Sequence, residues 1–182
     1  MIEVRFHGRG GQGSVIASGI LAEAAFREGK SIQSFPYFGV ERRGAPVTAF
    51  TRIDDKYIRI RHYIYKPDCI VVLEPSLVEA TNIVDGLKKE GLILINSDWD
   101  PDAFSFKKNF KIATVNASDI ATRLGLGSKT APIVNTAILG AFAKFTNIVT
   151  LDSVLAAIKE RVPMKREENI AAAKEAYEKV KF

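Results

Sequence analysis

Cysteine, histidine and tryptophan are scarce in this sequence. The chain of 182 residues contains one Cys, two His and one Trp. One cysteine and two histidines cannot ligate an iron–sulfur cluster or build a structural zinc site, so we expect no metal centre. Cys69 lies in an apolar segment and can form no disulfide within the chain. We therefore expect a buried thiol and a reducing, cytoplasmic location.

Long apolar runs and blocks of one charge are also missing. No run approaches the ~18 apolar residues that cross a bilayer, so we expect no membrane span. We expect no secretory signal, because no basic segment followed by an apolar one opens the sequence. The net charge is +5, but the basic residues are scattered, which disfavours nucleic acid and leaves acidic small molecules or acidic proteins as partners. The length and composition predict a single domain over residues 1–182.

A glycine-rich turn directly follows the first apolar segment. Residues 2–7 predict a strand, a helical pattern begins at Ser14, and between them lie Gly8, Arg9, Gly10, Gly11, Gln12 and Gly13. Glycines permit positive φ and close backbone approach, and a new helix points unpaired N–H groups at the turn. The G-x-G-x-x-G spacing in this context predicts a site for an anion or a ligand backbone. The alternative is a tight turn that binds nothing.

The residues that other ligand sites and catalytic sites require are absent. A nicotinamide site needs an acidic residue at the end of the second strand, which here falls in the neutral segment 33–35. No Gly-Lys-Ser/Thr follows the glycines, which excludes a Walker-type site. His7 is expected to cap a strand end rather than to touch a ligand. Because we find no Ser-His-Asp or Cys-His arrangement in a persuasive setting, we expect no catalytic residue.

Hydrophobic periodicity predicts a βαβ unit followed by a β-hairpin. The first helix is expected over 14–28 and the second strand over 31–35. The hairpin is expected to join strands 47–53 and 57–61 through a turn at 54–56. The buried stripe of the helix is predicted to comprise Val15, Gly19, Ala22 and Phe26. The solvated positions of the hairpin are predicted to include Arg52, Arg59 and Arg61.

The rest of the chain predicts buried parallel strands and then helices. Strands are expected over 69–73, 92–96 and 111–115, and helices over 75–87, from Ser118 or Asp119 to Gly125, and over 130–145, 152–161 and 166–181. The predicted fold class is α/β: a Rossmann-like three-layer sandwich with a mainly parallel sheet, a β-hairpin insertion and a helical C-terminal third. Asn135 lies on a nearly apolar helix, where a buried amide needs partners. It either holds the glycine turn in shape or meets a chain end or water.

The loop over 34–46 is unusually rich in aromatic residues. It combines three aromatics, two prolines and two glycines with the cluster Glu41-Arg42-Arg43. Such a loop predicts a surface for a ligand or a protein partner, with arginine available for carboxylate or phosphate. It should lie near the glycine turn, at the carboxyl ends of the parallel strands. A loop packed only on itself is the alternative.

Residues 6–13 (FHGRGGQG) and 37–46 (YFGVERRGAP) together closely resemble the gamma subunit of 2-oxoacid:ferredoxin oxidoreductases. The second stretch is most similar to the pyruvate branch, including gamma subunits shared with a branched-chain 2-oxoacid enzyme. The resemblance extends over essentially the whole chain. It implies a multi-subunit, heterotetrameric enzyme that converts pyruvate, coenzyme A and oxidised ferredoxin to acetyl-CoA, CO2 and reduced ferredoxin.

The same resemblance implies how the work is divided among subunits. Thiamine diphosphate and magnesium would reside in the alpha and beta subunits, and iron–sulfur clusters in beta and delta. The gamma subunit would serve coenzyme A binding and assembly, bind no cofactor alone and be inactive alone. The residues it would place at coenzyme A or at a subunit interface are Gly8, Arg9, Gly10, Gly11, Gln12, Gly13, Arg42 and Arg43.

Three alternatives stay open. The substrate could instead be a branched-chain 2-oxoacid, 2-oxoglutarate or indolepyruvate. The chain could be an assembly module whose glycine turn contacts only protein backbone. A free-standing nucleotide-binding oxidoreductase is disfavoured by the neutral end of the second strand.

Overall fold

Six strands form one mixed sheet in the order β2-β3-β1-β4-β5-β6 in the computed structural model, which describes residues 1–37 and 44–182. β1, β4, β5 and β6 pair in parallel, whereas β3 runs antiparallel between β1 and β2. The predicted mainly parallel α/β sheet is confirmed. The strands are β1 (Ile2–Arg9), β2 (Ser31–Pro36), β3 (Pro46–Asp54), β4 (Cys69–Val72), β5 (Leu92–Asn96) and β6 (Lys111–Val115).

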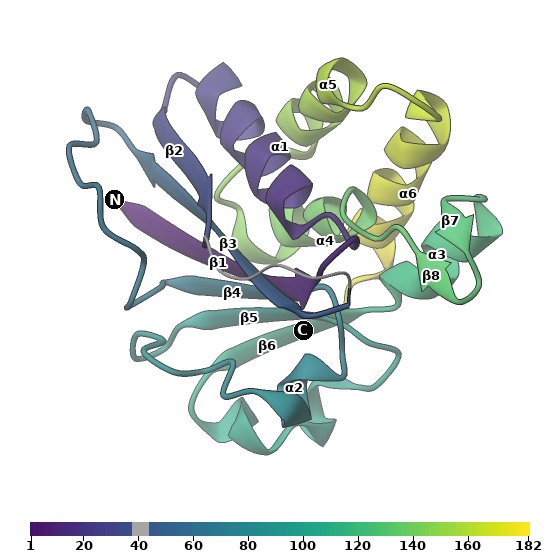
Figure 1. The fold of residues 1–182 in the computed structure, drawn as a ribbon, viewed down its shortest axis with the longest axis horizontal. Coiled ribbons are helices and arrows are strands. Elements are labelled where there is room, and N and C mark those ends of the chain that lie inside the picture. The colour runs from purple at the N-terminus through teal and green to yellow at the C-terminus, as the bar shows by residue number, and fades with distance from the viewer. Residues whose placement is uncertain (38–43) are drawn as a thin grey trace.

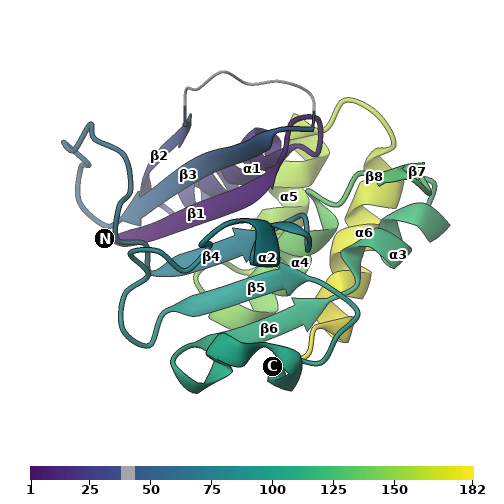
Figure 2. The same ribbon diagram turned by 60° about the horizontal axis from the view of Figure 1, so that its bottom comes forward.

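The two faces of the sheet are covered unequally. One face carries the long helices, while a short helix and two 3-10 turns lie on the other (Figures 1 and 2). Because side chains alternate along a strand, Cys69 and Val71 join the larger core and Ile70 and Val72 the smaller one. The long helices are α1 (Ser14–Arg27), α4 (Ala137–Thr146), α5 (Leu151–Arg161) and α6 (Arg166–Lys179); the short elements opposite are α2 (Leu77–Ala80), η1 (Pro101–Ala103) and η2 (Ser105–Lys108).

The buried stripe predicted for α1 is wrong at its two bulky residues. Val15 is 42% exposed and Phe26 is 62% exposed, whereas Ala22 is buried as predicted. The buried side is made instead of small residues and two larger ones, and it includes Ala17, Leu21 and Ala24. Alanines allow the helix axis to approach the sheet closely, so the small residues rather than the bulky ones mark the packed face.

The predicted hairpin over 47–61 is also wrong. Residues 57–61 form no strand, and β3 pairs instead with β1 on one side and β2 on the other. A small antiparallel hairpin does occur later, between β7 (Gly127–Ser128) and β8 (Ala131–Pro132). Alternation along β3 was therefore a poor guide to its neighbours, because a strand inside a sheet can bury both faces.

Arg52 on β3 is fully buried, whereas Arg59 and Arg61 are exposed as predicted. The Arg52 guanidinium donates to Glu3 Oε1 at 2.9 Å, to Gln33 Oε1 at 2.8 Å and to the His62 carbonyl at 2.8 Å. These contacts join β1, β2 and the segment that follows β3. A buried cation is tolerated here because its donors meet a carboxylate and two further oxygens.

Several predicted helix boundaries in the second half need correction. The helix expected over 75–87 is reduced to α2, and the chain continues in turns that include Gly86 at φ 70°. The helix after β6, α3 (Ala117–Arg123), is capped by Asn116, whose side chain accepts from the Asp119 N–H, rather than by Ser118 or Asp119. α4 begins seven residues later than predicted, because the preceding segment forms β8.

The C-terminal helices form a closely packed group, which confirms the predicted helical last third. A Cβ added to Gly140 of α4 would lie only 1.8 Å from the Ala173 carbonyl of α6, so glycine is required at this crossing. The chain end then returns to the sheet, where Lys181 pairs with Thr114 on β6. No helix in the described residues is long and apolar enough to cross a membrane.

We expect Arg52→Ala to destabilise the protein strongly. The change leaves the Glu3 carboxylate, 12% exposed, without its guanidinium partner, and breaking a buried ion pair costs roughly 3 kcal/mol or more. Urea unfolding of the full chain measures this loss. Exposed Arg59→Ala is the matched control and should change stability by less than about 0.5 kcal/mol. Equal effects of the two substitutions would contradict the role given to Arg52.

Candidate functional site

The glycine turn joins the carboxyl end of β1 to the start of α1. Gly11 has φ 98° and Gly13 has φ 83°, conformations that side-chain-bearing residues rarely adopt. Gly13 is the N-cap of α1, and within the described residues no side chain caps the helix. The first N–H groups of a helix carry a partial positive charge, so this end of α1 suits an anion.

Asn135, from a distant part of the chain, and Ser14, at the start of α1, pack closely against the turn. A Cβ on Gly13 would lie 2.4 Å from Asn135 Nδ2, and a Cβ on Gly8 would lie 2.2 Å from Ser14 Oγ. Both neighbours are buried, Asn135 being 5% exposed and Ser14 3% exposed. Within the described residues Asn135 Oδ1 and Ser14 Oγ have no hydrogen-bond partner. Asn135 therefore packs against the turn, and unsatisfied polar atoms gather there, which is unusual outside functional sites.

Gln12 connects the turn to the segment after β4. The Arg9 backbone N–H donates to Gln12 Oε1 at 2.7 Å, and Gln12 Nε2 donates to Glu74 Oε2 at 2.6 Å. Burial raises the pKa of Glu74, but the hydrogen bonds from Gln12 and Ser76 and the charge of Arg9 outweigh it and hold this pKa below its usual value. Glu74 is thus an ionised anchor for the turn.

The Arg9 side chain spans two neighbouring segments. Its guanidinium donates to the Gly44 carbonyl at 3.0 Å and to Ser76 Oγ at 3.0 Å. The Gly10 N–H donates to the Ala45 carbonyl at 2.9 Å. The described end of the aromatic-rich loop therefore meets the glycine turn, as predicted. Arg42 and Arg43, which were expected to join this site, lie outside the described residues.

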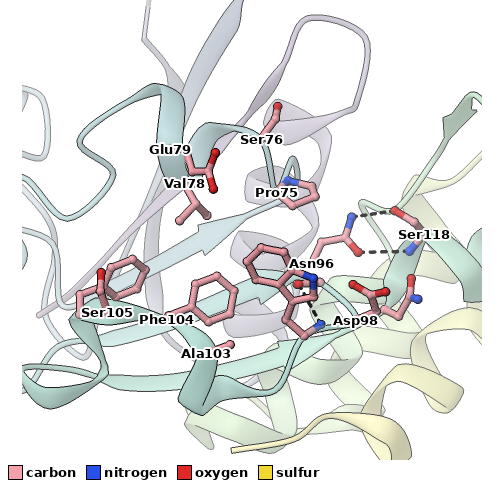
Figure 3. A pocket seen from close by; sticks show the side chains of 14 residues that line it. Pro75, Ser76, Val78, Glu79, Asn96, Asp98, Ala103, Phe104, Ser105 and Ser118 are labelled. Atoms are coloured by element: carbon pink, nitrogen blue, oxygen red, sulfur yellow. Dashed lines mark hydrogen bonds between the residues drawn. The ribbon is translucent and has the colours of Figure 1, made fainter.

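A cleft continues the same edge of the sheet beyond the turn. It has a volume of about 690 Å³ and lies at the carboxyl ends of β4, β5 and β6 (Figure 3). Asn96 is buried at its base and donates to the Leu73 carbonyl and to Ser118 Oγ, each at 2.9 Å. Sequence reasoning missed this cleft. An amide at the end of the otherwise apolar strand 92–96 was the signal available for it.

His7 lies within β1 rather than at its end, where it was expected, and Cys69 is the buried thiol that was expected. His7 Nε2 accepts from Arg5 Nε at 3.0 Å, and burial together with the Arg5 charge lowers the pKa of His7 to about 3. A neutral imidazole offers no charge to a phosphate. Cys69 is 2% exposed, and burial, aided by Asp68, raises its pKa to about 12. Among the described residues no group of three potential metal ligands occurs.

Comparison with known proteins identifies the family. The sequence matches the family described as "Pyruvate ferredoxin/flavodoxin oxidoreductase" over residues 3–179. The chain belongs to this family. The resemblance inferred from the two motifs is confirmed over almost the whole sequence.

Named relatives define the subunit within the pyruvate ferredoxin/flavodoxin oxidoreductase family. The chain is 56% identical to the pyruvate/ketoisovalerate oxidoreductases common subunit gamma of Pyrococcus furiosus, covering 98% of this chain and 97% of the relative. It is 52% identical to pyruvate synthase subunit PorC of Methanothermobacter marburgensis, covering 100% and 98%. The chain is therefore a gamma-type subunit of a pyruvate/2-oxoacid ferredoxin oxidoreductase.

Solved structures share the fold of this family member. The crystal structure of the pyruvate oxidoreductase subunit PORC from Thermotoga maritima is similar with a TM-score of 0.82 at 38% identity, covering 99% of this chain and 97% of that one. A 2-oxoglutarate:ferredoxin oxidoreductase from Magnetococcus marinus contains the same fold, with a TM-score of 0.74 at 19% identity. There the match covers 97% of this chain but 30% of that chain, so the fold recurs as part of a longer polypeptide.

We expect Gly13→Ala to destabilise the protein more than Gly11→Ala. Both positions have positive φ, which costs an alanine roughly 1 kcal/mol. Only at Gly13 does the new Cβ collide with Asn135, whereas at Gly11 it enters open space. Urea unfolding should therefore show a loss of about 2 kcal/mol or more for Gly13→Ala.

A double-mutant cycle separates the collision from the backbone strain. Combining Gly13→Ala with Asn135→Ala should recover the part of the loss that the collision causes and leave the part that φ causes. Additive effects of the two substitutions would contradict close packing between Gly13 and Asn135.

We expect the protein to lose stability as pH falls below 6.5, in a way that depends on His7. The pKa of His7 drops from 6.5 to about 3 on folding, so the unfolded chain takes up a proton that the native state does not. This contribution is complete above the unfolded pKa and declines as pH falls through it.

His7→Gln removes this titration and keeps an acceptor for Arg5. Relative to the variant, the wild-type protein should lose about 2 kcal/mol between pH 7 and pH 4.5. Urea unfolding at the two pH values gives the difference, in which the contributions of shared carboxylates cancel. Parallel losses in both proteins would mean that the pKa of His7 does not drop on folding.

Proposed function

We propose that this chain is the gamma subunit of a cytoplasmic pyruvate:ferredoxin oxidoreductase and that its glycine turn holds coenzyme A. The complex converts pyruvate, coenzyme A and oxidised ferredoxin to acetyl-CoA, CO2 and reduced ferredoxin. In this proposal residues 1–182 act as one domain in coenzyme A binding and subunit assembly. Thiamine diphosphate, magnesium and iron–sulfur clusters belong to the alpha, beta and delta partner subunits, and the isolated chain is inactive.

The geometry of the glycine turn carries the proposal. Helix N–H groups at Gly13 and the guanidinium of Arg9 lie at the same edge of the sheet. Coenzyme A brings a diphosphate and a 3′-phosphate, which suit backbone N–H donors and a nearby cation. The neutral end of β2, at Ser34 and Phe35, supports coenzyme A over a nicotinamide cofactor.

A structural neighbour also directs attention to coenzyme A. The Magnetococcus marinus enzyme that contains the same fold is described with 2-oxoglutarate, coenzyme A and succinyl-CoA bound. At 19% identity that likeness concerns the fold alone. We test coenzyme A because the glycine turn of this chain suits its phosphates, and no described residue points to 2-oxoglutarate.

The names of relatives favour a shared subunit as a second candidate. Two relatives, 56% and 55% identical, are named as common to pyruvate and ketoisovalerate oxidoreductases. One gamma subunit that serves both complexes fits a division of labour in which other subunits choose the 2-oxoacid. Anaerobic affinity isolation of this chain from its own cells, followed by viologen-dye assays with pyruvate and with 2-oxoisovalerate, distinguishes one complex from two.

We expect Arg9→Ala in the assembled complex to raise the KM for coenzyme A about tenfold, because a charge-assisted contact is worth roughly 1.5 kcal/mol. The kcat and the KM for pyruvate should not change, since this chain contributes no reacting group. Arg9→Lys should lie between Ala and wild type, and exposed Arg59→Ala is the matched control.

Two results would contradict the coenzyme A role. An unchanged KM for coenzyme A in fully assembled Arg9→Ala complex would remove Arg9 from the site. The second result concerns variants of Gly11 and Gly13. If these variants fail to assemble, and any complex that does form binds coenzyme A with unchanged affinity, the glycine turn contacts only protein and serves assembly alone.

A further inference from the structure

α1 has an apolar side that points away from the sheet. Val15, Gly19 and Phe26 follow one another at intervals of four and seven positions, which places them on one side of the helix. Val15 is 42% exposed, Ile16 beside it is 55% exposed and Phe26 is 62% exposed. A helix that is apolar on every side is normally buried on every side, so this side has the composition of an interface. The residues of this α1 face are Val15, Ile16, Gly19 and Phe26.

The charges beside the α1 face are already paired. α1 lies next to α5 (Figure 1), and its two charged residues are Glu23 and Arg27. Arg27 pairs with Glu23 at 3.3 Å and also with Glu160 of α5. Arg161 of α5 pairs with Glu23 at 3.3 Å. Two guanidinium groups and two carboxylates balance, so this rim favours an apolar protein surface over an acidic peptide or a nucleic acid.

Gly19 lies inside α1 although the packing of this chain does not require a glycine there. A glycine inside a helix weakens the helix relative to alanine, because its backbone loses more conformational freedom on folding. A Cβ added to Gly19 would meet no atom of the described residues within 4 Å. Alanine at position 19 would therefore fit the fold and strengthen α1. The glycine makes sense if another backbone approaches the α1 face closely from outside the chain.

The crossing at Gly140 shows what such a glycine does when its neighbour is present. Gly140 lies inside α4, and a Cβ there would be 1.8 Å from the Ala173 carbonyl of α6. Absence of a side chain lets the two helix backbones meet, since the distance between packed helices depends on the side chains at their contact. Gly19 has the same position inside its helix, with bulky Val15 and Phe26 on either side of the gap. A second helix is therefore the element that fits the α1 face.

We infer that the α1 face docks an apolar helix of another subunit of the same oxidoreductase, with Gly19 at the point of closest approach. This inference rests on the proposed function, because it takes that helix from a partner in the complex. In the Magnetococcus marinus enzyme the same fold is part of a longer polypeptide, so there it is joined directly to other parts of the enzyme. The α1 face begins two residues after Gly13, so the docked helix borders the glycine turn.

Gly19→Leu separates docking from folding. In the isolated full-length chain the urea midpoint should stay unchanged or rise, because leucine favours a helix more than glycine and enters open space. Assembly should weaken at least tenfold, because the new side chain holds the partner helix away. Anaerobic titration of the purified partner subunits, followed by size-exclusion chromatography, measures the affinity. Ala171→Leu adds the same bulk at an exposed position of α6 and should assemble as the wild type does.

Phe26→Gln tests the bulky end of the α1 face without adding a charge. The variant should keep its urea midpoint and assemble at least tenfold more weakly, because a large exposed ring has lost its partner surface. Tyr57→Gln replaces a ring that is 73% exposed elsewhere and is the matched control. A photoreactive phenylalanine analogue at position 26 of the assembled complex should cross-link to a helical peptide of a partner subunit, which mass spectrometry identifies.

Three results would overturn docking at the α1 face. Gly19→Leu could assemble with wild-type affinity, which would show that no helix approaches closely. The cross-link could join two copies of this chain, which would assign the face to self-association. The isolated Gly19→Leu chain could unfold at much lower urea, which would mean that its own fold requires the glycine.

Failure of the proposed function gives different results. An assembled complex that depends on Gly19 but oxidises another 2-oxoacid supports docking at the α1 face and overturns the assignment to pyruvate. The coenzyme A role is judged separately, by the KM for coenzyme A of the Arg9→Ala complex. An unchanged KM there, together with weak assembly of Gly19→Leu, supports the docking surface and overturns the coenzyme A contact.

Discussion

The close contact between Gly13 and Asn135 connects the two halves of the molecule. Gly13 ends the turn between β1 and α1, and Asn135 lies just before α4. A side chain at position 13 would collide with Asn135, so glycine at this position lets the N-terminal unit and the C-terminal helices pack closely in one core. The same contact leaves buried polar atoms of Ser14 and Asn135 without partners in the described residues. The packing of the two halves and the candidate site therefore both depend on the contacts among Gly13, Ser14 and Asn135.

Local sequence patterns correctly predicted strands that are buried on both faces and turns that require glycine. The strands over 92–96 and 111–115 are buried on both faces over most of their length, and their mainly apolar sequences identified them. The glycine turn was predictable because positive φ and a following helix leave a strong signal in sequence. Its position against the end of the aromatic-rich loop followed from the topology of parallel strands.

Features that depend on distant partners could not be predicted. Arg52 looked solvated because its neighbours alternate, yet its charge is balanced by Glu3, 49 positions away in the sequence. β3 looked like half of a local hairpin because sequence pattern does not show that it is inserted between β1 and β2. The cleft needed three strand ends and a 3-10 segment to meet, which no single motif encodes. The buried face of α1 was missed because alanine, not bulk, marks close helix–sheet packing.

The return of the chain end to the sheet has a consequence for how this protein meets others. Lys181 exchanges backbone hydrogen bonds with Thr114 of β6, so the last residues already occupy part of that border of the sheet. Within the described strands, β2 at the opposite border pairs only with β3. A partner that adds a strand to this sheet would find the β6 edge interrupted at Thr114, whereas no such bridge interrupts the described outer edge of β2. The two borders of the sheet therefore differ, which gives the sheet a direction in any larger assembly.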